Sequence, residues 1–248
     1  MCGNCRIGRR AFLCLAGGAA ATGLSGCDDI TLVSDEEVRQ MGLRAWSEIR
    51  GATALSGDTD ARQAAQQVGA RLLAAAGEDP AHWEIAVFAG PEINAFALPG
   101  NKIGLYEGMF GVFENADQLA AVVGHEIGHL QAEHSQERLS AAVAKDQGLA
   151  FLRWLLRMGE VEFADAIAAA MGVGLEFGVV LPYSRRQELE ADRLGVLMMD
   201  EAGFDAREAV GLWQAMDSAS QGRPPEFLAT HPAPAARIAE IEQILTEL

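Results

Sequence analysis

The most informative stretch of the chain places two histidines and a glutamate at a spacing suited to metal chemistry. Apolar residues recur at helical spacing from residue 115 to residue 134, so we expect a helix there. On that helix His125 and His129 lie one turn apart on one face, where two neutral imidazoles can bind one Zn²⁺. Glu126 lies to the side of that pair and can reach a water on the metal. It is therefore the candidate general base of a zinc hydrolase.

The competing interpretation is a surface helix that carries two ordinary histidines. The neighbouring residues Ala120, Ala121, Gly124 and Gly128 are small, which indicates a helix packed inside the protein. Burying two imidazoles and a carboxylate without a partner is costly. The metal site is therefore the favoured interpretation.

A second pair of carboxylates shares one face of a later helix. This helix is predicted from Tyr183 to about Ala202, with Ser184 as its N-cap. Glu188 is the natural third zinc ligand. Asp192, one turn further on, can accept the free N–H of a ligating histidine and so fix its tautomer. A surface helix rich in salt bridges is the alternative, because arginines and a further glutamate surround the pair.

His231 is the third element of the candidate site. It precedes the rigid run Pro232-Ala233-Pro234, which can orient its ring toward the candidate site. A purely structural zinc site needs four closed protein ligands, and His231 could supply the fourth. Glu126 argues against that interpretation, since a structural site has no use for a base.

The elements that must position these residues form a mainly helical α+β domain. Helices are expected at residues 35–50, 60–76 and 205–219 and at the C-terminus, with Ser34 capping the first and Asn115 or Asp117 capping the metal helix. Alternating patterns predict strands at residues 83–88, 93–98 and 102–106, with a turn at residues 99–101. We expect these strands to form a small antiparallel sheet packed against the zinc-binding helix.

One strand of this sheet is a candidate substrate-binding edge. An edge strand can pair with an extended peptide through backbone hydrogen bonds, and Asn94, Ala95, Phe96 and Ala97 are the candidate residues. The alternative is that this strand only completes the sheet. Residues 135–180 are Ala-rich and helical in pattern; a hairpin that completes the core is preferred there over a lid or a membrane contact.

Length, charge and the N-terminus limit the class of protein. The chain has 248 residues, enough for one catalytic domain with a core, and its net charge of -16 makes nucleic acid an unsuitable partner. Three arginines, an apolar stretch and then Leu24-Ser25-Gly26-Cys27 resemble a bacterial lipoprotein signal, in which Cys27 is acylated. Arg9-Arg10 also resembles a twin-arginine signal. An uncleaved anchor helix is the alternative.

These features predict the organisation of the chain. Residues 1–26 are the signal peptide, residues 27–34 the lipidated cysteine and a tether, and residues 35–248 the zinc domain. All four cysteines lie at or before Cys27, so we expect no disulfide to stabilise the mature domain. The expected location is the periplasmic side of a membrane, held by the lipid on Cys27. Asp28 and Asp29 favour the inner membrane.

The three motifs together resemble one family. His125-Glu126-Ile127-Gly128-His129, the segment from Ser184 to Asp192, and Thr230-His231-Pro232 with Arg237 resemble the HtpX/BepA/Oma-type zinc metallopeptidases, gluzincins related to the CAAX prenyl proteases. The segment from Asn94 to Gly100 also looks like that family's strand before the metal helix. The resemblance covers roughly residues 35–247 and is nearest to the exported, soluble BepA-like members.

The resemblance implies roles for individual residues. His125, His129 and Glu188 match the ligands of one Zn²⁺ per chain, Glu126 the general base, and Asp192 the carboxylate behind the ligands. His231 matches a histidine that can take the fourth zinc position and hold the enzyme latent. His231 and Arg237 are candidates for stabilising the oxyanion.

The expected function is a zinc metalloendopeptidase of envelope protein quality control, with unfolded or misassembled proteins as substrates. The alternative is a zinc-stabilised periplasmic chaperone or assembly factor with latent proteolytic activity.

Overall fold

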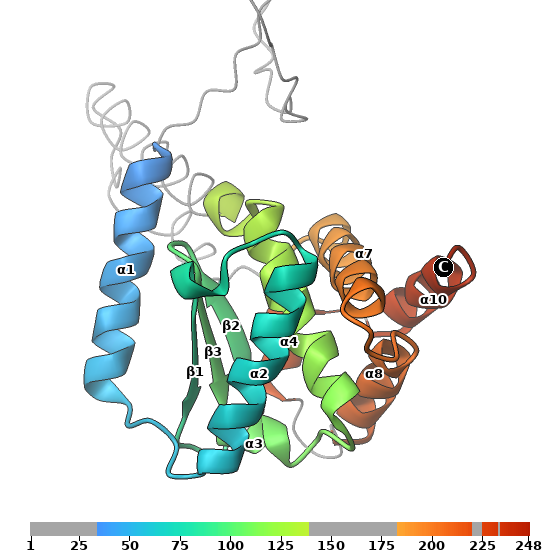
Figure 1. Cartoon of the computed structure of the whole chain (residues 1–248), viewed down its shortest axis with the longest axis horizontal. Helices are drawn as coiled ribbons and strands as arrows, with labels where there is room; N and C mark the ends of the chain where they lie inside the picture. The colour runs from blue at the N-terminus through green and yellow to red at the C-terminus, as the bar shows by residue number, and fades with distance from the viewer. Residues whose placement is uncertain (1–33, 139–182, 220–224, 233) are drawn as a thin grey trace, which may run out of the picture.

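The computed structural model describes residues 34–138, 183–219, 225–232 and 234–248. The expected signal segment with Cys27, and most of the Ala-rich stretch at residues 135–180, lie outside these ranges. The described elements are mostly helices around one small sheet, which confirms the α+β, mainly helical class (Figure 1). In these ranges no helix combines the length and apolar character that a bilayer crossing needs.

The first elements begin at polar caps that satisfy free helix N–H groups. Helix α1 (Asp35–Ala52) starts at Ser34, whose hydroxyl accepts from the backbone of Glu37 while the Glu37 carboxylate accepts from the backbone of Ser34. Helix α2 (Thr59–Ala75) starts at Asp58, whose carboxylate accepts from the backbone N–H groups of Asp60 and Ala61. A short 3₁₀ turn, η1 (Pro80–His82), then leads into the sheet.

The sheet has three strands, β1 (Glu84–Phe88), β2 (Ala95–Leu98) and β3 (Lys102–Tyr106), in the order β1-β3-β2. Strands β2 and β3 form an antiparallel hairpin, whose turn places Gly100 and Asn101 at φ 94° and 63°. Strand β1 pairs with β3 in parallel, so the expectation of a wholly antiparallel sheet was wrong. The hairpin folds back so that its second strand, β3, lies next to β1; alternation of side chains alone does not reveal this order.

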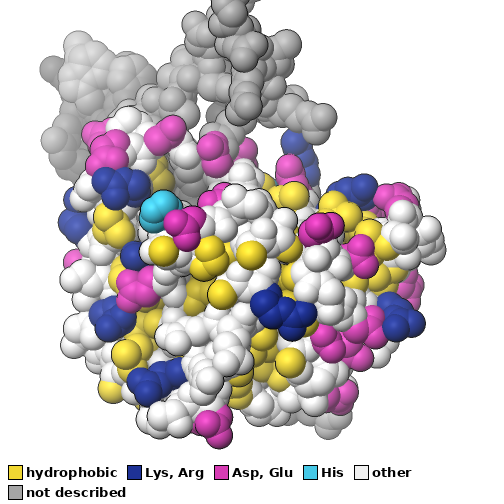
Figure 2. All heavy atoms as spheres, viewed as in Figure 1, with side chains coloured by type: hydrophobic (Ala, Val, Ile, Leu, Met, Phe, Trp, Pro, Cys, Tyr) yellow, Lys and Arg dark blue, Asp and Glu magenta, His cyan; other side chains and the backbone are white. Residues whose placement is uncertain are grey.

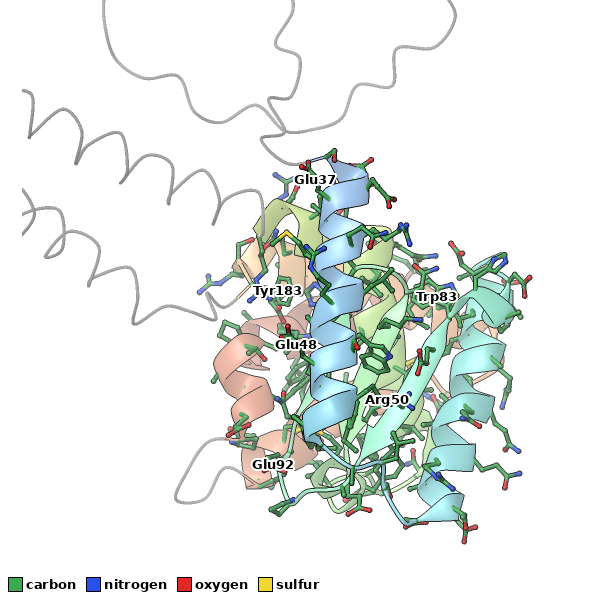
Figure 3. All side chains as sticks on the ribbon, turned by 90° about the vertical axis from the view of Figure 1, so that its left-hand side faces the viewer. Glu37, Glu48, Arg50, Trp83, Glu92 and Tyr183 are labelled. Atoms are coloured by element: carbon green, nitrogen blue, oxygen red, sulfur yellow. The ribbon has the colours of Figure 1, made fainter. Side chains whose placement is uncertain are left out.

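Each face of the sheet is covered by helices. On one face Trp46 of α1 packs against Phe88 of β1, with ring centroids 5.5 Å apart, and Phe96 of β2 joins this aromatic cluster. Figure 3 shows α1 lying across this face. On the other face Val87, Ile103 and other apolar side chains pack into the main core with α2 and α4 (Ala116–Gln131). Helix α4 is thus held between the sheet and the C-terminal helices.

The C-terminal part supplies the helices that surround α4. The bounds of the remaining elements are α3 (Glu107–Phe110), α7 (Arg185–Glu201), α8 (Glu208–Ala219), α9 (Glu226–Thr230) and α10 (Pro234–Leu245). Helix α7 packs closely against α4 (Figure 1). Glycines allow this approach, since a Cβ added to Gly124 would lie 3.3 Å from the Cα of Gly195. Glu188 on α7 is thereby brought to the histidines of α4.

The ends of α4 matter for the site. Asn115, rather than Asp117, is its N-cap and accepts a hydrogen bond from the backbone of Gln118 at 2.9 Å. The helix ends at Gln131, three residues before the predicted end, because Glu133 has φ 57° and turns the chain. That turn redirects His134 toward the histidines of the metal helix, as described below.

Candidate metal centre

Four side chains from three parts of the fold converge at one point. His125 and His129 come from α4, Glu188 comes from the first turn of α7, and His231 follows α9. One donor atom from each lies within 4.8 Å of the others. All four side chains are buried. Of the sequence-predicted zinc residues, the three ligands and the proposed fourth are therefore brought together.

The spacing of these atoms matches what a zinc ion requires. With Zn–N bonds of about 2.0–2.1 Å, neighbouring ligand atoms of a tetrahedral site are about 3.3 Å apart. His125 Nε2 lies 3.0 Å from His129 Nε2 and 3.2 Å from His231 Nδ1. Glu188 Oε1 lies 3.1 Å from His231 Nδ1 and 3.5 Å from His129 Nε2. Three imidazoles and one carboxylate at these separations are a donor set that fits Zn²⁺.

Partners behind the two helix-borne histidines are placed to set the tautomer that a metal ligand needs. His125 Nδ1 lies 3.0 Å from Asp192 Oδ1, and His129 Nδ1 lies 3.0 Å from His134 Nδ1. A proton on each Nδ1 leaves Nε2 free to bind a metal. Burial lowers the pKa of His129 to about 3 and the pKa of His125 well below its ordinary value. Both rings are therefore neutral at pH 7, as ligands must be.

Glu188 is ionised at the same point. Burial by itself would raise its pKa, but hydrogen bonds with His129 and His231, together with the charge of Arg237, hold the pKa well below its usual range. The Arg237 guanidinium forms an ion pair with Glu188. The site therefore offers an anionic oxygen beside neutral nitrogens, which is the combination that binds Zn²⁺.

Arg237 lies behind the ligands and is fully buried. Its Nε donates to Asp192 Oδ2 at 2.6 Å, and its Nη2 donates to Asp192 Oδ1 at 2.5 Å. The guanidinium carbon lies 3.6 Å from the centre of the Trp213 ring, on which it stacks. Arg237 thus joins α10 to Glu188 and Asp192 of α7.

Both carboxylate oxygens of Glu126 have unused bonding capacity. The residue is fully buried, yet neither carboxylate oxygen accepts a hydrogen bond from any described residue. His231 lies beside it, with its Nε2 3.5 Å from Glu126 Oε1. Burial raises the pKa of Glu126 to about 7. A carboxylate in that position can accept and return a proton near neutral pH.

Two neighbours of the centre were not predicted from the sequence. His134 contacts His129 because of the turn at Glu133, and a glutamate at positive φ leaves no sequence signal. The Tyr183 ring stacks on His129 with centroids 3.8 Å apart and an interplanar angle of 23°. Tyr183 immediately precedes the Ser184 cap, and that adjacency to a recognised motif is the only hint the sequence carries.

The predicted substrate strand lies at the sheet edge next to the C-terminal elements. Strand β2 is an edge strand, and Asn94 precedes it. The backbone N–H of Phe227 in α9 donates to the carbonyl of Ile93 at 3.1 Å. The outer edge of β2 therefore starts where α9, which leads into His231, is attached. The residues Ala95, Phe96 and Ala97 continue along that edge.

Comparison with known proteins gives a consistent picture. Residues 60–245 match the model of the family described as peptidase family M48. The chain is 36% identical over 179 residues to the mitochondrial metalloendopeptidase OMA1 of Schizosaccharomyces pombe, covering 71% of this chain and 51% of that protein. It is 32% identical over 210 residues to the beta-barrel assembly-enhancing protease of Escherichia coli, covering 81% of this chain and 42% of that protein. The chain spans about half the length of these relatives.

Proposed function

The chain belongs to peptidase family M48, and on that premise we propose that it is a zinc-dependent metalloendopeptidase. The observation that carries the proposal is the four-residue donor cluster with the unsatisfied carboxylate of Glu126 beside it. A structural zinc site would not need that buried carboxylate. A buried carboxylate without hydrogen-bond partners destabilises the fold, so its presence here indicates a functional role.

We assign the roles as follows. His125, His129 and Glu188 would hold one Zn²⁺ per chain. When bound, zinc supplies Lewis acidity toward the scissile carbonyl and toward a nucleophilic water. Glu126 would take a proton from the attacking water onto its carboxylate and deliver it to the leaving amine. Asp192 and His134 keep the two α4 histidines in the tautomer that exposes Nε2.

His231 is proposed as the fourth ligand of the resting protein. Its Nδ1 lies within ligand distance of the other donors, while its Nε2 faces Glu126. This ring must move before a substrate can approach the carboxylate. Once displaced, it remains a candidate donor to the oxyanion. Arg237 is better placed to balance the charges of Glu188 and Asp192 than to reach a substrate, because both carboxylates contact its guanidinium.

The substrate is proposed to bind as an extended chain along β2. In the hairpin, the carbonyl of Asn94 accepts from Tyr106, so Asn94 and Phe96 direct their backbone groups toward β3. Ala95 and Ala97 then direct theirs to the outer edge. A polypeptide added there would be bound through backbone hydrogen bonds, which do not depend on its side chains. This suits unfolded proteins of varied sequence as substrates.

We further propose that the protein serves envelope protein quality control as an exported lipoprotein. The name of the Escherichia coli relative, a beta-barrel assembly-enhancing protease, supports an envelope role. The sequence Leu24-Ser25-Gly26-Cys27 supports a lipid anchor on Cys27 at the periplasmic side of a membrane. Metabolic labelling with a fatty-acid analogue would test the anchor, since a Cys27→Ser variant should lose the label.

The test of the activity is cleavage of unfolded casein by the zinc-loaded full chain, with Glu126→Gln as its control. Cleavage by the wild type alone supports both the protease and its base. No cleavage by either protein indicates latency or a non-proteolytic role; His231→Ala should restore cleavage in the first case. The chaperone or assembly alternative predicts that Glu126→Gln keeps its biological function. Equal cleavage by both proteins would refute the role of Glu126.

A further inference from the structure

Strand β1 has an outer edge that is only partly covered. The backbone of Glu84 donates to Asn101 beside β3, so in this parallel pair the even-numbered residues of β1 face β3. The odd-numbered residues face outward. At the end of the strand, Ser56 donates to the carbonyl of Val87 and Ala89 donates to Ala54. The N–H and C=O of Ile85 and the N–H of Val87 therefore point to an edge that no described strand occupies.

Two adjoining cavities follow this open edge. One has a volume of about 470 Å³ and the other about 230 Å³, and Gln66, Glu84 and Ile85 line both. Helix α2 forms one wall, and Arg50 near the end of α1 contributes to the other. Figure 3 looks onto this side of the molecule, with Arg50 and Trp83 labelled beside the strand that lies between α1 and α2. We call this feature the β1 groove. It is also lined by Leu55, Arg62 and Trp83.

The β1 groove contains side-chain donors that lack acceptors. Arg62 Nε and Trp83 Nε1 are both buried atoms, and neither donates a hydrogen bond to any described residue. Leu55, at the end of the groove, is one of three large hydrophobic residues that are exposed in the described part of the chain. Unpaired buried donors have a cost in stability. The N–H groups of Ile85 and Val87 also point to this edge, so an occupant that supplies carbonyl or carboxylate oxygens would complement it.

The charge of the groove favours an acidic occupant. Glu84 is already neutralised, since it forms ion pairs with Arg50 and with Lys102. Arg62 has no acidic partner among the described residues, which leaves the groove locally positive. This contrasts with the protein as a whole, whose net charge is -16. Figure 2 shows acidic side chains distributed over the visible face, with basic ones between them.

We propose that the β1 groove binds an extended, acidic segment of a protein substrate as an additional strand beside β1. The segment would pair with Ile85 and Val87 through its backbone and place a carboxylate at Arg62. This site is at the opposite edge of the sheet from β2, where the scissile segment is expected, so one unfolded chain could contact both edges. That the occupant is a substrate rests on the proposed peptidase function; the binding itself does not.

The test measures binding without cleavage. The full-length, zinc-loaded Glu126→Gln protein is titrated into a fluorescein-labelled decapeptide of alternating valine and glutamate, and into the matching valine–lysine peptide. Fluorescence anisotropy reports the affinity. Gln66→Trp fills the groove, whereas Gln67→Trp places the same side chain at an exposed neighbour that lines neither cavity. Arg62→Glu reverses the charge of the groove, with Arg44→Glu on the exposed face of α1 as its control.

We expect Gln66→Trp to weaken binding of the glutamate peptide at least tenfold, and Gln67→Trp to change it less than twofold. Arg62→Glu should reverse the preference between the two peptides, and Arg44→Glu should leave it unchanged. Hydrogen exchange should show new protection of the Ile85 and Val87 amides when the glutamate peptide binds. Equal affinity of Gln66→Trp and Gln67→Trp, or no new protection at Ile85, would overturn the proposal.

The same proteins separate this proposal from the proposed function. If the wild type does not cleave casein but the groove variants change the peptide affinity as expected, the peptidase function is refuted and the groove proposal is supported. If casein is cleaved and Gln66→Trp leaves both binding and KM unchanged, the groove fails and the peptidase function stands. If both hold, Gln66→Trp should raise the KM for casein and leave kcat within twofold.

Discussion

The contact between α4 and α7 should be intolerant of a single methyl group at Gly128. A Cβ at this position would lie 2.8 Å from the carbonyl oxygen of Ala191 and 3.1 Å from its Cα. These are backbone atoms, which cannot rotate away as the end of a side chain can. The Gly128→Ala variant therefore forces the two helices apart, and these helices carry three of the four proposed ligands.

The size of the effect follows from the geometry. Ordinary contact begins at 3.4 Å, so the oxygen and the new methyl group must separate by 0.6 Å. Overpacking of this kind costs about 1–3 kcal/mol of the free energy of unfolding. Metal–ligand distances vary by only about 0.2 Å among sites for one metal, so moving Glu188 by more than that should weaken zinc binding. We expect a loss of zinc affinity of about tenfold to a hundredfold, as for other disturbances of ligand position.

Two measurements test this prediction. Urea unfolding of the metal-free protein gives the free energy of unfolding, and competition with a chelator gives the zinc affinity. Gly51→Ala is the matched control, because a Cβ at this exposed position of α1 meets nothing within 4 Å. It should be neutral or stabilise the protein by up to about 1 kcal/mol. If Gly128→Ala matches Gly51→Ala in both measurements, the close contact does not position Glu188.

Three further predictions concern the metal and its ligands. Asp192→Asn should lower zinc affinity about tenfold to a hundredfold in chelator competition, with its fold intact by circular dichroism. Removing zinc from a sample held at 1,000 times its Kd should lower the free energy of unfolding by about 4 kcal/mol, measured as the difference between zinc-loaded and chelator-treated protein. In chelator, that free energy should fall as the pH drops from 6.5 toward 4. The pKa of His129 is lowered to about 3 and that of His125 well below its ordinary value, so over this range the unfolded state binds two protons there that the folded state does not. Glu126, whose pKa is raised to about 7, binds one proton in the folded state only, which leaves a net of one proton. The contribution is about 1.4 kcal/mol per pH unit, and His129→Gln should reduce the slope; an unchanged slope would contradict the assignment.

Local signals in the sequence were sufficient to predict the helices and the residues that meet at the candidate metal centre. The capping residues Ser34, Asn115 and Ser184 hold the helix starts, because an N-cap side chain satisfies N–H groups only two or three residues away. The i, i+4 spacing of His125 and His129 likewise depends on helix geometry alone. Such features involve few residues close in sequence, so a pattern can reveal them.

Features that depend on distant contacts were not predictable in the same way. The order of strands in the sheet depends on which strand β1 meets, and the alternation of residues 102–106 is the same in either arrangement. The contact of His134 with His129 depends on Glu133 adopting φ 57°, and no sequence pattern predicts that conformation. The β1 groove is defined by α1, α2 and the sheet together. No single stretch of sequence contains it.

The charges around the centre explain why Asp192 and Arg237 occur together although they are 45 residues apart in the sequence. With neutral imidazoles, Glu188, Asp192 and Arg237 sum to one negative charge, and an ionised Glu126 would make two. Two uncompensated buried negative charges cost several kcal/mol, which is consistent with burial raising the pKa of Glu126. A divalent cation balances that sum. Without Arg237 the proposed ligands would carry excess negative charge, and without Asp192 the guanidinium would repel a bound cation, so the pair balances the charge for the proposed zinc site and its proposed base.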